Sequence, residues 1–187
     1  MVSTGNYART LLKALEFAAE KHRDQRRKGV EASPYINHPI QVAEVLATFG
    51  QIDDLTTLTA AILHDTIEDT DTTKTDLEDL FGADVAEVVS EVTDDKSLPK
   101  QERKRLQVEP TPHLSTRAKQ IKIADKACNV IDIGLRPPEN WSEVRRKEYF
   151  DWAEAVIAGC RGVNEGLEDY FDRCVADSKS RQTKAFS

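Results

Sequence analysis

The segment AAILHDTIEDTDTT (60–73) places four ionisable side chains directly after a short apolar run. His64 and Asp65 come first, and Glu68 and Asp69 follow about one helical turn later. If the segment is one helix, residues four apart lie over one another, about 5–6 Å between Cβ atoms, which brings His64 close to Glu68. A cation beside this helix would reach both His64 and Asp65 and would relieve the repulsion among the carboxylates. The alternative is a solvated acidic helix end.

A metal held by His64 and Asp65 needs further ligands, and His38 is one candidate. It lies just before Pro39 in the segment YINHPIQVA (35–43), where a helix is expected to begin. An imidazole at a helix start is poorly placed for core packing and well placed to meet another element. Taken alone, His38 is better explained as a capping or turn histidine, and it becomes a ligand candidate because a metal at His64 and Asp65 needs partners.

Asp125 is the second candidate, because it interrupts the apolar pattern of IKIADKACN (121–129). A carboxylate beside a buried stripe is costly unless it is paired or bound to a metal. Asn129 follows four residues later on the same helix face, within reach of a metal or a ligand. The alternative is a surface ion pair of Asp125 with Lys122 or Lys126.

Together these candidates form a set of two imidazole and two carboxylate ligands: His38, His64, Asp65 and Asp125. This mixture favours Mn²⁺, Fe²⁺, Co²⁺ or Zn²⁺ over an all-oxygen Ca²⁺ or Mg²⁺ site. Four protein ligands leave open positions on a five- or six-coordinate ion, where a water molecule can be activated for attack. Glu68 and Asp69, one turn beyond the ligands, are placed to position that water or to handle its protons.

Two basic clusters accompany these acidic residues. The segment KHRDQRRKG (21–29) carries a local charge of +4 in a chain whose net charge is −7. A second cluster lies within 94–115 and comprises Lys100, Arg103, Lys104 and Arg105. Guanidinium and ammonium groups bind phosphates well, so the clusters indicate a phosphorylated substrate. The alternative is solvated basic helix ends. His22 is better explained as a packing or positioning histidine than as a ligand, and His113 is left unassigned.

The composition limits the class of protein. The chain has 187 residues, of which 39% are hydrophobic and 32% charged, as expected for one globular domain. Its net negative charge argues against nonspecific binding to nucleic acid or to anionic membranes. Three widely spaced cysteines form no CxxC pair, so reduced thiols and a cytoplasmic location are expected. The sequence shows no membrane-spanning run, no secretory signal and no obligate protein partner.

Helical periodicity runs through most of the chain, and strand patterns are nearly absent. We expect a first helix near the N-terminus, a second that begins at Pro39 and a third capped by Asp53 or Asp54. A capping box at 75–78 predicts a short helix that Gly82 ends.

The second half of the chain is expected to continue this pattern. The polar segment 94–115 predicts a loop with a short helix inside, of the kind that often covers a functional site. Ser115 is expected to cap the helix that carries Asp125, and one last long helix is expected from about Ser142 past Leu167.

No internal repeat and no linker divides the chain. We therefore predict an all-α protein with a single helical-bundle domain over residues 1–178. Residues 179–187 lack periodicity and are predicted to form a frayed C-terminal tail.

These motifs resemble those of the HD-domain phosphohydrolases, and more closely those of the guanosine-alarmone hydrolases. That group includes the hydrolase module of RelA/SpoT-type enzymes and the stand-alone small alarmone hydrolases, among them the metazoan SpoT-homologue group. The matching segments occur in family order from the first helix to about residue 165: HRDQRRKG, YINHP, LHDTIEDTDTT, VTDDKSLPKQERKRLQ, KIADKACN and WSEVRRKEYFDWA. Ile67, Ile123 and the pair Ala127–Cys128 depart mildly from the family pattern.

The resemblance implies an all-α HD fold in which the four-residue ligand set binds one Mn²⁺ ion. It also implies that Glu68 and Asp69 activate the water, and that ppGpp or pppGpp is hydrolysed to GDP or GTP plus pyrophosphate. The family's substrate-binding positions match six residues here: Arg27, Lys28, Lys100, Asn129, Arg145 and Tyr149. No synthetase or regulatory domain is recognised, so we expect hydrolase activity alone.

Two alternatives share parts of this pattern. Some HD-domain relatives remove the 2′-phosphate of NADPH, and the residues named here do not exclude that substrate. The other alternative is a protein that keeps the fold and binds a nucleotide without catalysis. The complete ligand set and the intact Glu68–Asp69 pair argue against it, because closely placed acids are costly to keep without a task.

Overall fold

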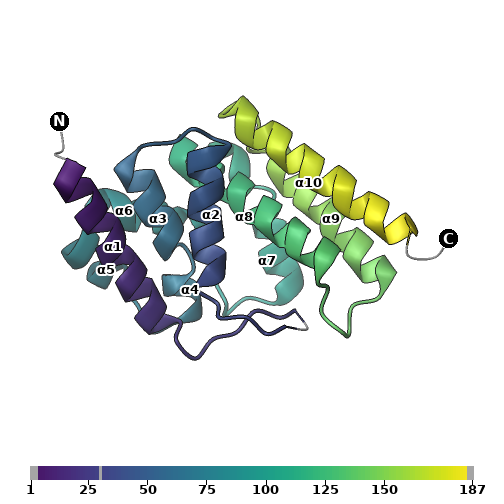
Figure 1. Cartoon of the computed structure of the whole chain (residues 1–187), viewed down its shortest axis with the longest axis horizontal. Coiled ribbons are helices and arrows are strands. Elements are labelled where there is room, and N and C mark those ends of the chain that lie inside the picture. The colour runs from purple at the N-terminus through teal and green to yellow at the C-terminus, as the bar shows by residue number, and fades with distance from the viewer. Residues whose placement is uncertain (1–3, 30, 185–187) are drawn as a thin grey trace.

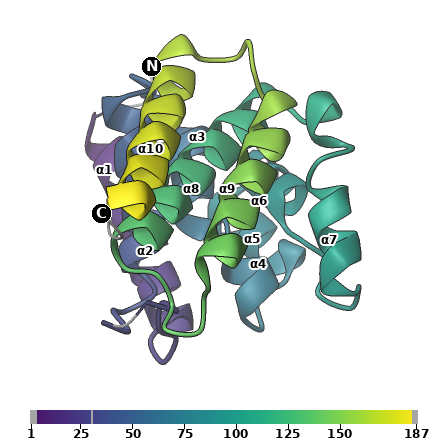
Figure 2. The same ribbon diagram turned by 90° about the vertical axis from the view of Figure 1, so that its right-hand side faces the viewer.

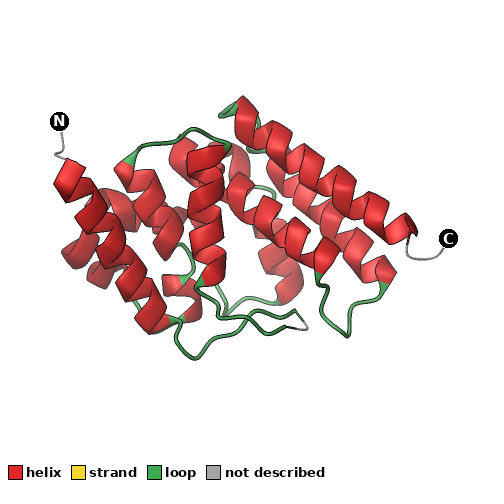
Figure 3. Ribbon diagram, in the orientation of Figure 1, coloured by secondary structure: helices red, strands yellow, loops and turns green. Residues whose placement is uncertain are grey.

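The computed structural model describes residues 4–29 and 31–184, and its elements are helices (Figures 1 and 3). The helices are α1 (Thr4–Lys21), α2 (Asn37–Thr48), α3 (Leu55–Leu63), α4 (Thr66–Asp69), α5 (Lys74–Phe81), α6 (Ala83–Val92), α7 (Lys100–Leu106), a 3-10 turn (Thr111–His113), α8 (Thr116–Leu135), α9 (Glu143–Ala158) and α10 (Glu165–Lys184). Within the described ranges no strand occurs, only an isolated bridge between Arg26 and Pro34. The predicted all-α class is confirmed. None of the described helices combines the length and the apolar character that crossing a membrane would require.

Helix α8 lies at the centre of the molecule and packs against helices on several sides. It contacts α2, α3 and α6 on one side and α9 and α10 on the other, and α10 runs alongside it in both views (Figures 1 and 2). Its apolar residues belong to one core cluster shared with these helices. A residue on the polar side of α8 is therefore held in place by most of the fold.

Helix α3 is buried along nearly its whole length, from Thr57 to Leu63. Its N-cap is Asp54, one of the two expected caps, whose side chain accepts a hydrogen bond from the Thr57 amide at 3.0 Å. The same carboxylate accepts from Arg117 Nε at 2.8 Å, which ties the start of α3 to the start of α8. The helix that precedes the His64–Asp65 pair is thus fixed at its other end.

The acidic segment is not the one continuous helix that the expected stacking of His64 over Glu68 assumes. α3 ends at Leu63, His64 and Asp65 lie in a turn, and α4 begins at Thr66. The Thr66 hydroxyl donates to the Leu63 carbonyl at 2.7 Å, and side-chain hydroxyls that bond backbone carbonyls compete with regular helix.

Two further boundaries differ from the expectation. The capping box that opens α5 is formed by Thr73 and Asp76 rather than by 75–78, because the Thr73 side chain accepts from the Asp76 amide and the Asp76 carboxylate accepts from Thr73. Gly82 ends this helix as predicted, with a φ of 94° that favours glycine. Ser115 caps α8 as predicted.

The last helical stretch consists of two helices, α9 and α10, rather than one. Glu168 Oε1 accepts hydrogen bonds from the amides of Gly162, Val163 and Asn164, which caps α10 and closes the turn. Gly162 lies there at a φ of 86°. These contacts involve a local turn that the apolar periodicity does not reveal.

Helix α10 continues into the segment that the sequence predicts as a frayed tail. Residues 179–184 are helical, and residues 185–187 lie outside the described ranges. Just before that segment, Ser178 is buried and its hydroxyl donates to the Val130 carbonyl of α8 at 3.2 Å. Lys179, the first residue of that segment, pairs with Asp151 and Glu154 of α9.

The crossing of α8 and α10 is close at Gly134, which gives a test of this packing. A Cβ atom at Gly134 would lie 2.4 Å from Ser178 Oγ and 2.7 Å from Ser178 Cβ. Overpacking costs about 1–3 kcal/mol, whereas alanine gains about 1 kcal/mol over glycine in a helix. We expect Gly134→Ala to lower the thermal unfolding midpoint, and the added change Ser178→Gly to restore part of it. An unchanged or higher midpoint for Gly134→Ala would contradict the close crossing.

Candidate metal centre and the cavity around it

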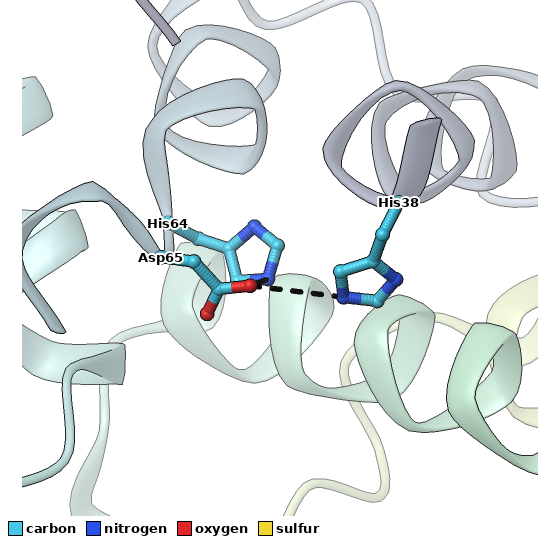
Figure 4. Close-up of side chains that lie close together, drawn as sticks. All are labelled: His38, His64 and Asp65. Atoms are coloured by element: carbon cyan, nitrogen blue, oxygen red, sulfur yellow. Dashed lines mark ion pairs between the residues drawn. The ribbon is translucent and has the colours of Figure 1, made fainter. Parts of the chain in front are cut away.

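Three elements bring the candidate ligands together. His38 lies in the first turn of α2, His64 and Asp65 lie between α3 and α4, and one ligand atom of each falls within 4.8 Å of the others. Figure 4 shows the imidazole of His38 facing the imidazole of His64 and the carboxylate of Asp65. Asp125 joins from α8, with its Oδ1 3.1 Å from His38 Nε2 and 4.0 Å from His64 Nε2.

The spacing between the two imidazoles and each carboxylate fits a single ion beside His38 and His64. Asp65 Oδ2 lies 3.1 Å from His64 Nε2 and 3.9 Å from His38 Nε2. Ligand atoms bonded at about 2.1 Å to one ion lie about 3.0 Å apart at right angles and about 4.2 Å apart on opposite sides. The four nitrogen–oxygen distances fall inside this range.

The hydrogen bonding of His64 also fits a ligand. Its Nδ1 lies 2.8 Å from the Ala61 carbonyl, which only accepts, so Nδ1 carries the proton. Its Nε2 is buried and has no hydrogen-bond partner among the described residues, although Asp65 Oδ2 is close. A ring nitrogen held in this way presents its free position to the cluster, as metal-binding histidines do.

Neighbouring side chains orient the two carboxylates. Tyr35 donates its hydroxyl to Asp65 Oδ2 at 2.6 Å. Asp125 accepts from Asn129 Nδ2 at 2.5 Å on Oδ1 and from Lys126 Nζ at 2.8 Å on Oδ2. The ion pair with Lys126 that the sequence offered as a surface alternative thus exists, but both partners are largely buried. It therefore supports the cluster instead of replacing it.

The charges of the cluster are strongly coupled. Burial raises the pKa of Asp65 and Asp125, but cationic neighbours outweigh it: His64 lowers the pKa of Asp65, and Lys126 lowers that of Asp125. At His64 burial is outweighed by the two carboxylates, which raise its pKa to about 9, whereas burial lowers the pKa of His38. A proton on His64 and a divalent cation are alternative ways to balance two ionised carboxylates, so metal binding is coupled to proton release.

Glu68 and Asp69 lie on α4 at the edge of this cluster. Burial, with Asp94 and Asp65 nearby, raises the pKa of Glu68 to about 7. Glu68 Oε2 accepts from the Asp94 amide at 3.2 Å, and Oε1 lies 4.0 Å from Lys96 Nζ without a hydrogen bond. Asp69 has both oxygens engaged, because Lys96 contacts Oδ1 and Gln25 Nε2 donates to Oδ2 at 2.7 Å. The two acids therefore differ in hydrogen bonding, since Asp69 has a partner on each oxygen and Glu68 has one only on Oε2.

A chain of hydrogen bonds behind Asp69 includes Gln25, which the sequence did not single out, and His22, which it predicted as a packing or positioning residue. Because the Gln25 amide nitrogen donates to Asp69, its Oε1 must accept from His22 Nδ1, which lies 2.6 Å away. His22 is buried and packs on the Tyr35 ring with centroids 4.9 Å apart. The chain His22–Gln25–Asp69 thus runs beside the contact of Tyr35 with Asp65. The i,i+3 spacing of His22 and Gln25 was the only signal in the sequence.

A cavity of about 1030 Å³ opens over the cluster, and all twelve residues assigned from the sequence line it. Arg27 is less available than expected, because it donates to Asn129 Oδ1 and Asp132 Oδ2, each at 2.8 Å. Lys28 and Lys100 are exposed at the rim. α7, within the segment predicted to cover a site, forms one wall.

Aromatic residues line another part of the cavity wall. The Arg145 guanidinium lies 4.4 Å from the Trp141 ring centre, and the Tyr149 ring packs edge-on to Trp152 at 5.3 Å. Lys126 and Lys104 also lie over the Trp152 ring, at 5.1 and 4.9 Å. Arg145 and Tyr149 were expected at this site, whereas the two tryptophans were not. Flat rings beside cations suit a nucleobase next to phosphates.

The cavity lining is basic although the chain is acidic. Eleven of its lining residues are lysine or arginine and eight are aspartate or glutamate, against a net charge of −7 for the whole chain. Four of the contributing lysines were not assigned to the site from the sequence: Lys96, Lys104, Lys122 and Lys126. Lys122 and Lys126 could have been found from their helical spacing with Asp125 and Asn129. The cavity therefore combines a cation-binding end with walls that attract an anion.

Comparison with known proteins places this arrangement in a family. The HD domain family matches residues 14–153, which span the candidate ligands and most of the cavity. The chain belongs to the HD-domain family. This HD-domain protein is 56% identical to guanosine-3′,5′-bis(diphosphate) 3′-pyrophosphohydrolase MESH1 of Homo sapiens over 165 residues, which cover 88% of this chain and 92% of that one.

Two further comparisons agree in sequence and in structure. The MESH1 protein of Danio rerio is 55% identical over 159 residues, covering 85% of this chain and 88% of the relative. A solved structure of a metazoan ortholog of SpoT, described as hydrolysing ppGpp, superposes with a TM-score of 0.87 at 48% identity. It covers 89% of this HD-domain protein and 94% of its own chain. The recognised resemblance to the metazoan SpoT-homologue group is thereby confirmed.

Metal binding by this HD-domain protein can be tested through its stability. A ligand at 100 times its Kd stabilises the folded state by about 2.7 kcal/mol, so we expect added Mn²⁺ to raise the thermal unfolding midpoint. Asp65→Ala and Asp125→Ala should abolish both this rise and Mn²⁺ binding in calorimetry. Asp132→Asn is the matched control, because Asp132 lines the same cavity but pairs with Arg27. Equal loss in the control would contradict the assignment of ligands.

Proposed function

We propose that this HD-domain protein hydrolyses the 3′-pyrophosphate of guanosine alarmones, converting ppGpp or pppGpp to GDP or GTP plus pyrophosphate. The observation that carries the proposal is the ligand cluster of His38, His64 and Asp65, with Asp125 beside His38, in a cavity lined by lysine and arginine. The names of the similar MESH1 proteins and of the SpoT ortholog support the same substrate. A guanosine alarmone offers a polyanion for the basic walls and a base for the aromatic wall.

We assign the metal as one Mn²⁺ ion per chain, held by His38, His64, Asp65 and Asp125. Two nitrogen and two oxygen ligands suit Mn²⁺, and they also suit Fe²⁺, Co²⁺ or Zn²⁺. When bound, such an ion polarises a phosphoryl oxygen and lowers the pKa of water. Tyr35, Asn129 and Lys126 keep the two carboxylates aimed at this position.

Glu68 and Asp69 then have separate tasks. Glu68, with a pKa raised to about 7 by burial, suits proton transfer at Oε1. Asp69 is held by Gln25 and Lys96 and orients the attacking water through its fixed carboxylate. Removal of a proton from the water and its correct orientation both lower the barrier.

The remaining assigned residues bind the nucleotide. Lys28, Lys100 and Arg145 make no ion pair with described residues, so their charges are available to phosphates. Arg27 is anchored by Asp132 and positions Asn129 beside the cluster. Tyr149 contributes its ring to the aromatic wall.

We also propose a cytoplasmic setting and a small nucleotide as the partner. Cys128, Cys160 and Cys174 are buried free thiols, a state typical of a reducing compartment. The basic residues line a cavity instead of an extended face, which fits a small nucleotide better than nucleic acid.

The substrate is tested by giving the Mn²⁺-loaded protein ppGpp and NADPH in separate reactions. We expect pyrophosphate release from ppGpp to be the faster reaction. Release of phosphate from NADPH with no turnover of ppGpp would instead favour the 2′-phosphatase alternative. No turnover of either substrate by metal-loaded protein would contradict a hydrolase and leave a nucleotide-binding protein.

The division of roles is tested by two substitutions. Glu68→Ala should retain Mn²⁺ and lower kcat about 10²–10⁴-fold, the usual contribution of a general acid or base. Asp65→Ala should lose metal and activity together. Metal analysis of both purified variants checks this, and loss of Mn²⁺ from Glu68→Ala would show that Glu68 is a ligand.

The His22–Gln25–Asp69 chain predicts that Gln25 is a positioning residue. Gln25→Ala frees one oxygen of Asp69, so we expect kcat to fall about tenfold with KM nearly unchanged. The kcat of Gln25→Glu should fall further, because a second carboxylate repels Asp69. Arg23→Ala is the control, since Arg23 is exposed and bonds only to nearby Glu20 and Asp24. A rise in KM at constant kcat would contradict the positioning role.

A further inference from the structure

Lys122 on α8 is a buried lysine with no partner of opposite charge. Only 7% of its surface is exposed, yet it lines the cavity. Among the described residues it makes no hydrogen bond and no ion pair. Lys126, one turn further along α8, is buried to a similar extent but pairs with Asp125 at 2.8 Å. Two neighbouring lysines thus share one buried face, and only one of them is neutralised.

An unpaired buried cation is costly, and the nearby carboxylates Asp94 and Asp125 offset this cost only in part. Burial and the charge of Lys126 lower the pKa of Lys122, which shows that its surroundings disfavour the charged form. The closest acidic groups already have partners. Asp94 accepts a hydrogen bond from Gln107, and Asp125 accepts from Lys126 and Asn129. An anion that enters the cavity would supply the missing charge.

The position of Lys122 along α8 indicates which part of a ligand it meets. It precedes Asp125 by three residues, one helical turn or about 4.5 Å along the axis on the same face. Asn129 and Asp132, which hold Arg27, follow Asp125 by one and two turns. Basic groups therefore flank the metal centre in both directions along the helix.

We propose that Lys122 binds the distal phosphate of the substrate's pyrophosphate group and thereby selects pyrophosphate esters over monophosphate esters. The inference rests on the proposed function for the identity of the substrate. The phosphate next to the ester oxygen lies at the metal centre, the nucleoside extends toward Arg27 and Asn129, and the second phosphate reaches the Lys122 side. A monophosphate ester occupies the centre and leaves Lys122 without a partner.

The first test measures binding without turnover. Calorimetry with the Mn²⁺-loaded protein compares inorganic pyrophosphate with orthophosphate in the wild type, Lys122→Met, Lys122→Arg and the control Lys119→Met. Lys119 lies on the same helix but bonds to the Pro112 carbonyl outside the cavity lining. Loss of a charge-assisted hydrogen bond should weaken pyrophosphate binding to Lys122→Met at least about tenfold. Orthophosphate binding should change less than about twofold, and Lys122→Arg should restore part of the pyrophosphate affinity.

The thermal unfolding midpoint separates ligand binding from a structural role, because the loss of a structural lysine would lower the midpoint. Because an unpaired buried charge is unfavourable, Lys122→Met should leave the thermal unfolding midpoint of the unliganded protein unchanged or higher. Pyrophosphate should raise the midpoint of the wild type and of Lys119→Met more than that of Lys122→Met. Unfolding of Lys122→Met, or equal weakening of phosphate and pyrophosphate binding, would overturn the proposal.

Kinetics separate this inference from the proposed function. With ppGpp, Lys122→Met should lower kcat/KM about tenfold or more, while any NADPH phosphatase rate should be unaffected. If the wild type hydrolyses no alarmone but the pyrophosphate-selective binding depends on Lys122, the proposed function fails and the subsite stands. If alarmone hydrolysis is rapid and Lys122→Met binds pyrophosphate like the wild type, the subsite fails and the function stands.

Discussion

Two largely buried carboxylates, Asp65 and Asp125, face the same pair of imidazoles, and the surrounding structure compensates their charge. Tyr35 donates to one carboxylate, and Lys126 and Asn129 donate to the other. Ionised groups are tolerated at such depth only when they are paired, hydrogen-bonded or bound to a metal. Because the partners come from different segments of the chain, the cluster holds its geometry only when α2, α3 and α8 are packed together. The core and the metal centre are thus one cooperative unit.

Helix α8 serves both parts of that unit. Its apolar residues pack against five other helices, and its polar residues that line the cavity recur at helical spacing: Lys122, Asp125, Lys126, Asn129 and Asp132. A rigid, buried helix holds charged groups at fixed positions without help from the substrate. Lys122 remains unpaired in this arrangement, which lowers stability, and an anion bound in the cavity would compensate its charge.

The loop between α1 and α2 also positions the acidic side chains of the site. Its backbone folds back through the bridge between Arg26 and Pro34, which aims Gln25 at Asp69 and Tyr35 at Asp65. The acid proposed to orient water and a proposed metal ligand are therefore held by one short loop. The loop is anchored in turn by buried His22, so an irregular segment acquires the order that a catalytic group needs.

The sequence alone determined the features that depend on local chemistry. Caps such as Asp54 and Ser115, the all-α class and the candidate ligands could be predicted, because helix signals and metal-binding side chains are properties of short segments. The tertiary structure decided the features that depend on distant partners. The turn at His64–Asp65, the separate α9 and α10, and the ordered end of α10 arise from contacts that periodicity does not encode. The same is true of the Gln25–Asp69 bond and the isolation of Lys122, since a hydrogen bond or its absence depends on which remote segment arrives beside the residue.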